Sequence, residues 1–166
     1  GLNSVLGYNT LEVAAHHDVG VGVGDPRSNA YDVLGVEYIL SRGALESAFT
    51  EGERPLTLLT SNDVVWIYRR ARVLPIARLV YQTEIITDPT QARARINEPD
   101  FDPTTTAILG AEAPCQIGPA PETPGTAEIV DRSPGYWLVE TESSAPSLHV
   151  LSETTYPGWR VTIDGT

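Results

Sequence analysis

Three adjacent side chains near the N-terminus, those of His16, His17 and Asp18, form the only cluster with the residue types of metal ligands. Consecutive side chains on an extended segment point in opposite directions, so adjacent histidines rarely bind one ion. The sequence has neither a His-x-x-x-His spacing nor a nearby third histidine that would complete a zinc site. We therefore expect these residues to be polar surface groups, and we predict no metal and no cofactor.

Two routes to catalysis remain, a nucleophile with a histidine base and a pair of carboxylates. The chain has no Gly-x-Ser-x-Gly elbow, and the one further histidine, His149, falls within a predicted strand. Glu140 and Glu142 share one face of another predicted strand, and a glycosidase needs only two suitably spaced carboxyls. Solvated acids on the outer face of a sheet have the same pattern. We predict no catalytic residue, and a glycan-active enzyme with paired carboxylates stays as an alternative.

An aromatic segment near the C-terminus contains the candidate ligand-binding residues. The Pro-Gly pair at 157–158 predicts a type II turn that delivers Trp159 and Arg160 to the start of a strand. Together with Tyr156 and Glu153, these residues resemble a platform for a glycan, because an aromatic ring stacks on a sugar while charged groups bind its hydroxyls. In the structural alternative, Trp159 closes the end of a sandwich and Arg160 pairs with an acid.

The first 99 residues predict a small mixed part of short helices and strands. The Asp-Pro pairs that begin at Asp25 and Asp88 each supply an N-cap carboxylate and a proline at the first helical position. They predict helices near residues 26–34 and 89–97. Runs rich in Val, Ile, Leu and Tyr, each bounded by polar or turn-forming residues, predict strands at 36–40, 56–60, 64–69 and 77–86.

Residues 100–166 predict an incomplete β-sandwich, truncated at its C-terminal end. The proline-rich stretch 111–124 predicts a loop. Short apolar runs separated by turn signals predict strands at 104–109, 127–132, 136–141, 148–152 and 159–163. The predicted fold class is therefore α+β and mostly antiparallel β, with a mixed part at 1–99 followed by the partial sandwich.

The last predicted strand has a clear alternation of side chains. Trp159, Val161 and Ile163 alternate with polar residues, so we expect the face that they share to point inward. The Asp-Gly pair at 164–165 then fits a type I′ hairpin turn. Because a hairpin turn needs a returning strand, and because the chain begins at Gly1 without any methionine, we expect a piece of a longer polypeptide.

Composition and charge exclude several classes of function. The hydrophobic fraction of 41% and the charged fraction of 20% are those of a folded protein. Twenty-two acidic residues against 11 basic ones, all of them arginine, give a net charge of −11, which disfavours binding to nucleic acid through a basic patch. The single cysteine, Cys115, excludes an internal disulfide and a cysteine zinc cluster.

A resemblance to a known family rests on several segments that follow one another in a fixed order. Residues 151–165, Leu-Ser-Glu-Thr-Thr-Tyr-Pro-Gly-Trp-Arg-Val-Thr-Ile-Asp-Gly, closely resemble a signature of the extracytoplasmic C-terminal region of YfhO-like bacterial membrane proteins. The other segments that resemble this family are 7–9 (Gly-Tyr-Asn), 31–40 (Tyr-Asp-Val-Leu-Gly-Val-Glu-Tyr-Ile-Leu), 65–69 (Val-Trp-Ile-Tyr-Arg), 74–80 (Leu-Pro-Ile-Ala-Arg-Leu-Val) and 100–103 (Asp-Phe-Asp-Pro). The resemblance spans nearly the whole chain.

The resemblance implies a parent protein with many membrane helices before residue 1, similar to membrane glycosyltransferases that take sugars from polyprenyl-phosphate donors. The catalytic acids of that family lie in loops between its early membrane helices, so none is carried over to this chain. We expect a non-catalytic domain on the extracytoplasmic face of the bacterial cell membrane, which contacts the membrane-embedded part of its own polypeptide and positions a cell-envelope glycan acceptor. A purely structural cell-surface β-sandwich module is a further alternative.

Overall fold

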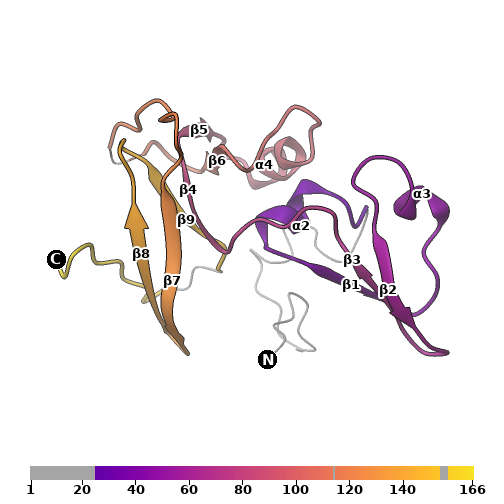
Figure 1. The fold of residues 1–166 in the computed structure, drawn as a ribbon. Coiled ribbons are helices and arrows are strands. Elements are labelled where there is room, and N and C mark those ends of the chain that lie inside the picture. The colour runs from indigo at the N-terminus through magenta and orange to yellow at the C-terminus, as the bar shows by residue number, and fades with distance from the viewer. Residues whose placement is uncertain (1–24, 114, 154–156) are drawn as a thin grey trace.

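The computed structural model describes residues 25–113, 115–153 and 157–166, and it is an α+β fold of mostly antiparallel strands. The strands form several small sheets (Figure 1). In chain order the described elements are α2 (Asn29–Val33), β1 (Tyr38–Ser41), α3 (Ser47–Thr50), β2 (Thr57–Ser61), β3 (Trp66–Arg69), β4 (Ala77–Val80), β5 (Gln82–Ile85), α4 (Pro89–Ile96), β6 (Thr106–Leu109), β7 (Thr126–Ser133), β8 (Tyr136–Glu142) and β9 (Leu148–Leu151). The predicted fold class is confirmed.

The first three strands form an antiparallel sheet in the order β1-β3-β2, with α3 beside it at one end of the molecule (Figure 1). Tyr68 in the central strand is only 2% exposed, and its hydroxyl accepts a hydrogen bond of 2.9 Å from the backbone N–H of Leu45. Leu56, directly before β2, is equally buried. These side chains anchor the sheet to the loop that carries α3.

The chain changes strand partners at Tyr81, where the predicted strand at 77–86 is divided into β4 and β5. β4 pairs antiparallel with β9, whereas β5 pairs parallel with β6. The buried Tyr81 hydroxyl accepts a hydrogen bond of 2.8 Å from the N–H of Gly125 and lies 3.0 Å from the Ser143 hydroxyl. Because these two residues flank the β7–β8 hairpin, one phenol ties the hairpin to β4. A side chain at Gly125 would collide with the Glu142 carbonyl.

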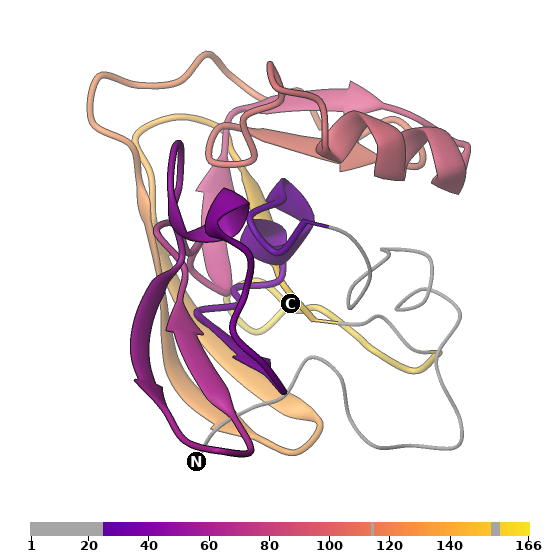
Figure 2. The same cartoon turned by 90° about the vertical axis from the view of Figure 1, so that its right-hand side faces the viewer.

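Both of these pairings join strands from the two sides of the predicted boundary between residues 99 and 100. β4 and β5 come before that boundary, whereas their partners β9 and β6 come after it. Figure 2 shows the parallel β5–β6 pair beside α4. The mixed part and the strands that follow it therefore share two sheets.

Residues 159–163 do not form the predicted strand. Val161 is 87% exposed and Ile163 is 73% exposed, so the prediction that their face points inward is wrong. Side-chain alternation indicates which residues would share a face, but a strand also needs a neighbour for its backbone hydrogen bonds. In the described part of the chain no strand pairs with this segment.

The turn predicted after that segment is confirmed. Asp164 and Gly165 both have positive φ angles, of 50° and 82°. The backbone groups of Ile163 and Thr166 exchange two hydrogen bonds, of 3.1 and 3.0 Å. This is the geometry of a two-residue type I′ turn, so the local preference of the Asp-Gly pair is satisfied without a sheet.

A fully buried carboxylate lies at the centre of the molecule, surrounded by arginines. Asp32 in α2 is 0% exposed, and its oxygens contact Arg70 at 2.7 Å, Arg72 at 2.6 Å and Arg54 at 3.3 Å. We call Arg54, Arg70 and Arg72 the arginine cluster. Burial lowers the pKa of the Arg70 guanidinium even though Asp32 opposes this shift. Arg70 is thus a cation held away from water, and Asp32 is its counter-ion.

The same cluster links three parts of the chain. Arg70 follows β3 and donates to the backbone carbonyls of Pro26, Ser28 and Val36, which surround α2. Asn29 accepts hydrogen bonds from the arginine cluster through its side-chain oxygen, and its amide nitrogen donates to carbonyls at the end of α4 and at Phe101. The short α2 is therefore held by polar contacts on both sides.

We expect Asp32→Asn to lower the free energy of unfolding by about 3–5 kcal/mol, because it leaves the buried Arg70 without a counter-ion. Denaturant titration of both proteins measures this difference. The matched control is Glu128→Gln, which removes an exposed acid that faces Glu140 across the β7–β8 pair. This control is expected to be neutral or slightly stabilising, because like charges directly opposite each other are unfavourable. Equal losses in the two variants would contradict the role given to Asp32.

A further arginine, Arg95, attaches α4 to β5. Arg95 makes two hydrogen bonds to the carboxylate of Glu84, of 2.7 and 2.8 Å, and it also bonds Glu98 and Asp100 at 2.8 Å. Its guanidinium lies 5.4 Å from the ring centroid of Phe101. The hydrogen bonds from Arg95 lower the pKa of Glu84 and the pKa of Asp100 below their ordinary values of 4.5 and 3.8.

The direction of these shifts predicts how stability depends on pH. Since the folded protein holds both carboxylates ionised more readily than the unfolded chain, they stabilise the fold above their ordinary pKa values. This contribution is lost as the pH falls through the lowered values. We expect the melting temperature of wild type to exceed that of Arg95→Gln by a constant amount above about pH 5, and to converge on it as the pH falls below about 4. The exposed Arg42→Gln should keep the wild-type profile, and parallel curves for wild type and Arg95→Gln would contradict this assignment.

Candidate functional site

The predicted glycan platform falls on a part of the chain that the structure describes incompletely. Trp159 is 37% exposed and Arg160 is exposed, both in a segment without a strand, and Tyr156 lies outside the described residues. Glu153, which follows β9, is the predicted site residue with a defined partner. That partner is Arg132, with 3.8 Å between Nη2 and the Glu153 carboxylate.

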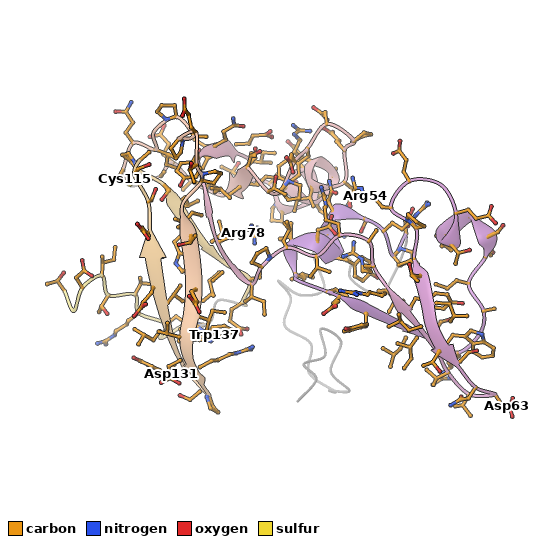
Figure 3. The ribbon with its side chains drawn as sticks, viewed as in Figure 1. Arg54, Asp63, Arg78, Cys115, Asp131 and Trp137 are labelled. Carbon is orange, nitrogen blue, oxygen red and sulfur yellow. The ribbon has the colours of Figure 1, made fainter. Side chains whose placement is uncertain are left out.

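Arg132 also lies over an aromatic ring, and the three side chains form one site. Its guanidinium carbon is 3.8 Å from the ring centroid of Trp137, the distance of a close cation–π contact. Arg132 belongs to β7, Trp137 to β8, and Glu153 to the segment after β9. We call Arg132, Trp137 and Glu153 the hairpin cluster. Figure 3 labels Trp137 on the β7–β8 hairpin, near Asp131 at the hairpin's lower end.

A β-bulge in β7 positions Arg132 on the face of Trp137. Ile129 pairs with Val139, but the next pair is Asp131 with Leu138, so Val130 is an extra residue on the β7 side. One extra residue reverses the faces of all the side chains that follow it in the strand. Without the bulge, Arg132 would point to the opposite face of the hairpin. With it, Arg132 pairs directly with Trp137.

The hairpin cluster places two charged side chains beside a half-buried indole. Trp137 is half-buried, and the side chains of Arg132 and Glu153 remain 39% and 34% exposed. The guanidinium offers several N–H donors and the carboxylate offers acceptors, which together match the alternating donors and acceptors of sugar hydroxyls. The indole, one face of which Arg132 covers, adds apolar surface and an N–H donor.

The acids considered for catalysis are exposed, as expected of solvated strand residues. Glu140 and Glu142 lie on β8 with their side chains in water, and Glu140 is directly opposite Glu128 of β7. This face of the hairpin is separate from the face that carries Trp137, because the two sets alternate along β8. The observed placement favours solvated acids over a pair of carboxyls in a cleft.

The residues considered as metal ligands fall in different parts of the chain. His16, His17 and Asp18 lie outside the described residues, and His149 falls in β9, in the strand predicted for it. The part of the chain that the structure describes contains no group of three or more side chains arranged to hold a metal ion.

Sequence reasoning missed two members of the hairpin cluster. The alternation of Trp137 with Val139 in a predicted strand could have indicated that the indole points to the inner face. Arg132 could not have been assigned to the same face, because no residue of the 129–131 segment signals a bulge, and a regular register places it outside.

Comparisons with protein-family models, with curated proteins and with solved structures give no match to this chain. Among the helices that the structure describes, none has the length and apolar character needed to cross a membrane.

The placements of Trp137 and Trp159 predict losses of stability of different size when each is removed. We expect Trp137→Ala to cost about 2 kcal/mol, because the half-buried indole loses its apolar contacts and its stacking with Arg132. Trp159→Ala is expected to cost less than about 1 kcal/mol, because none of the described strands pairs with its segment. Denaturant unfolding of both variants tests this order. A larger loss for Trp159→Ala would restore the interpretation of Trp159 as a core residue.

Proposed function

We propose that this chain is a non-catalytic extracytoplasmic domain of a YfhO-like multi-pass membrane protein and that it holds a glycan acceptor. The ordered segments that resemble this family support the first part of the proposal. The hairpin cluster supports the second part, because it combines an indole, a guanidinium and a carboxylate on one accessible surface. Such a surface would position an acceptor while the membrane-embedded part of the same polypeptide transfers the sugar.

The single observation that carries glycan binding is the joint placement of Arg132, Trp137 and Glu153. The hydroxyls of a sugar would accept from the guanidinium of Arg132 and donate to the carboxylate of Glu153. The apolar face of the sugar would lie against the part of Trp137 that Arg132 leaves uncovered. Because Arg132 is held over the indole before any ligand binds, little side-chain entropy would be lost on binding.

We expect neutral oligosaccharides to shift the indole N–H signal of Trp137 in two-dimensional NMR spectra. The chain has three tryptophans, and Trp66 in β3 serves as an internal reference whose signal should not move. Glu153→Gln should weaken binding about tenfold, the effect of losing one charge-assisted hydrogen bond. The matched control, Glu140→Gln on the opposite face of β8, should bind as wild type does.

Other outcomes would favour the alternatives. Shifts confined to Trp159 would move the platform back to the segment around that residue. No shift at any tryptophan would favour a purely structural module. Release of reducing sugar by wild type, lost in Glu140→Gln, would favour a glycan-active enzyme with paired carboxylates.

A further inference from the structure

The arginine cluster contains more positive charge than its counter-ions neutralise. Arg54, Arg70 and Arg72 carry three positive charges around Asp32, and the only other carboxylate paired with them in the described residues is Asp102, with 3.9 Å between its oxygen and Nη1 of Arg72. Three positive charges against two negative ones leave an excess of one. This local excess of positive charge contrasts with the net charge of the whole chain, which is −11.

Two of these arginines have donors that face solvent. Their side chains are 39% exposed for Arg54 and 29% exposed for Arg72, whereas Arg70 is 3% exposed and bonded to backbone carbonyls. Arg54 donates only through Nη1, to Asn29 and Asp32, so its Nε and Nη2 have no partner among the described residues. Arg72 donates through Nε and Nη2, and its Nη1, 3.9 Å from an oxygen of Asp102, makes no hydrogen bond to the described residues.

The inner edges of both guanidinium groups are fixed by the same two acceptors. The Asn29 side-chain oxygen accepts from Arg54 at 2.8 Å and from Arg72 at 2.7 Å, and an oxygen of Asp32 also contacts both. The two guanidiniums are therefore held side by side. Each guanidinium presents its N–H donors as a planar fork, a geometry that matches the oxygens of a phosphate.

The backbone at Arg54 also has an uncommon conformation. Its φ angle is +51°, in the left-handed region that residues other than glycine, asparagine and aspartate rarely adopt. Such a conformation costs energy and persists where surrounding contacts determine it, often at binding sites. Here the contacts are the hydrogen bonds of the Arg54 side chain to Asn29 and Asp32, which direct its other edge outward.

We propose that the outer edges of Arg54 and Arg72 bind a phosphate group. A phosphate has several acceptor oxygens and up to two negative charges, so it can accept from both guanidiniums and neutralise the local excess. A carboxylate has two oxygens in one plane and a single charge, and it fits this pair less well. In Figure 3, Arg54 lies near α2, away from Trp137 on the β7–β8 hairpin, so this site is separate from the hairpin cluster.

The test is the binding of inorganic phosphate to the 166-residue chain at constant ionic strength, followed by the side-chain Nε–H signals of its arginines. We expect the Arg54 signal to shift on addition of phosphate and to be unaffected by an equal concentration of acetate. Methyl phosphate is the model of a phosphate ester, and it should shift the same signal if the phosphate group itself is recognised. A shift with inorganic phosphate alone would indicate a site for the free ion.

Arg54→Gln should weaken phosphate binding at least tenfold, as expected from the loss of about 1.4 kcal/mol or more. Arg54→Lys keeps the charge without the planar fork and should lose less affinity. The matched control is Arg42→Gln, an exposed arginine that is expected to leave binding unchanged. If Arg54→Gln fails to fold, the shift of the Arg54 signal in wild type still decides the outcome. No shift, or equal losses in Arg54→Gln and Arg42→Gln, would overturn the proposal.

Discussion

The rest of this fold depends on the neutralisation of one buried carboxylate. Asp32 is fully closed to water, and an isolated ionised carboxylate in that position would cost many kcal/mol. Arg70 compensates it directly, and the same guanidinium bonds the carbonyls around α2. A helix of five residues is too short to be stable alone. Its place in the molecule therefore depends on side-chain contacts made by Asn29 and Asp32, which join it to the end of β3 and to α4.

A second constraint, the change of strand partner at Tyr81, connects this centre to the hairpin. β4 begins a few residues after the arginine cluster and pairs with β9, which places Glu153 beside the β7–β8 hairpin. The Tyr81 hydroxyl then holds Gly125 at the start of β7. The change of partner at Tyr81 thus brings the β7–β8 hairpin and the segment after β9 together, and the hairpin cluster forms where they meet.

Local signals in the sequence predicted much of the fold, and interactions between distant residues account for what they missed. The Asp88 side chain caps α4 through the N–H of Gln91 at 2.8 Å, as the Asp-Pro pair indicated. The strands before residue 153 lie where apolar runs predicted them. The arginine cluster had no such signal, because Asp32 meets arginines 22 to 40 residues away. Long side chains reach such partners without leaving a periodic pattern in the sequence.

The two proposed sites differ in how the charge of the whole chain acts on them. A net charge of −11 repels an approaching anion at long range, while the arginine cluster attracts it at contact. Salt at physiological strength screens charges beyond about 8 Å, so it weakens the distant repulsion more than the short contacts with Arg54 and Arg72. A phosphate should therefore lose less affinity with added salt here than at a basic surface of similar local charge. Neither the long-range repulsion nor the local attraction acts on a neutral glycan at the hairpin cluster. Its binding depends on hydrogen bonds and ring contacts alone.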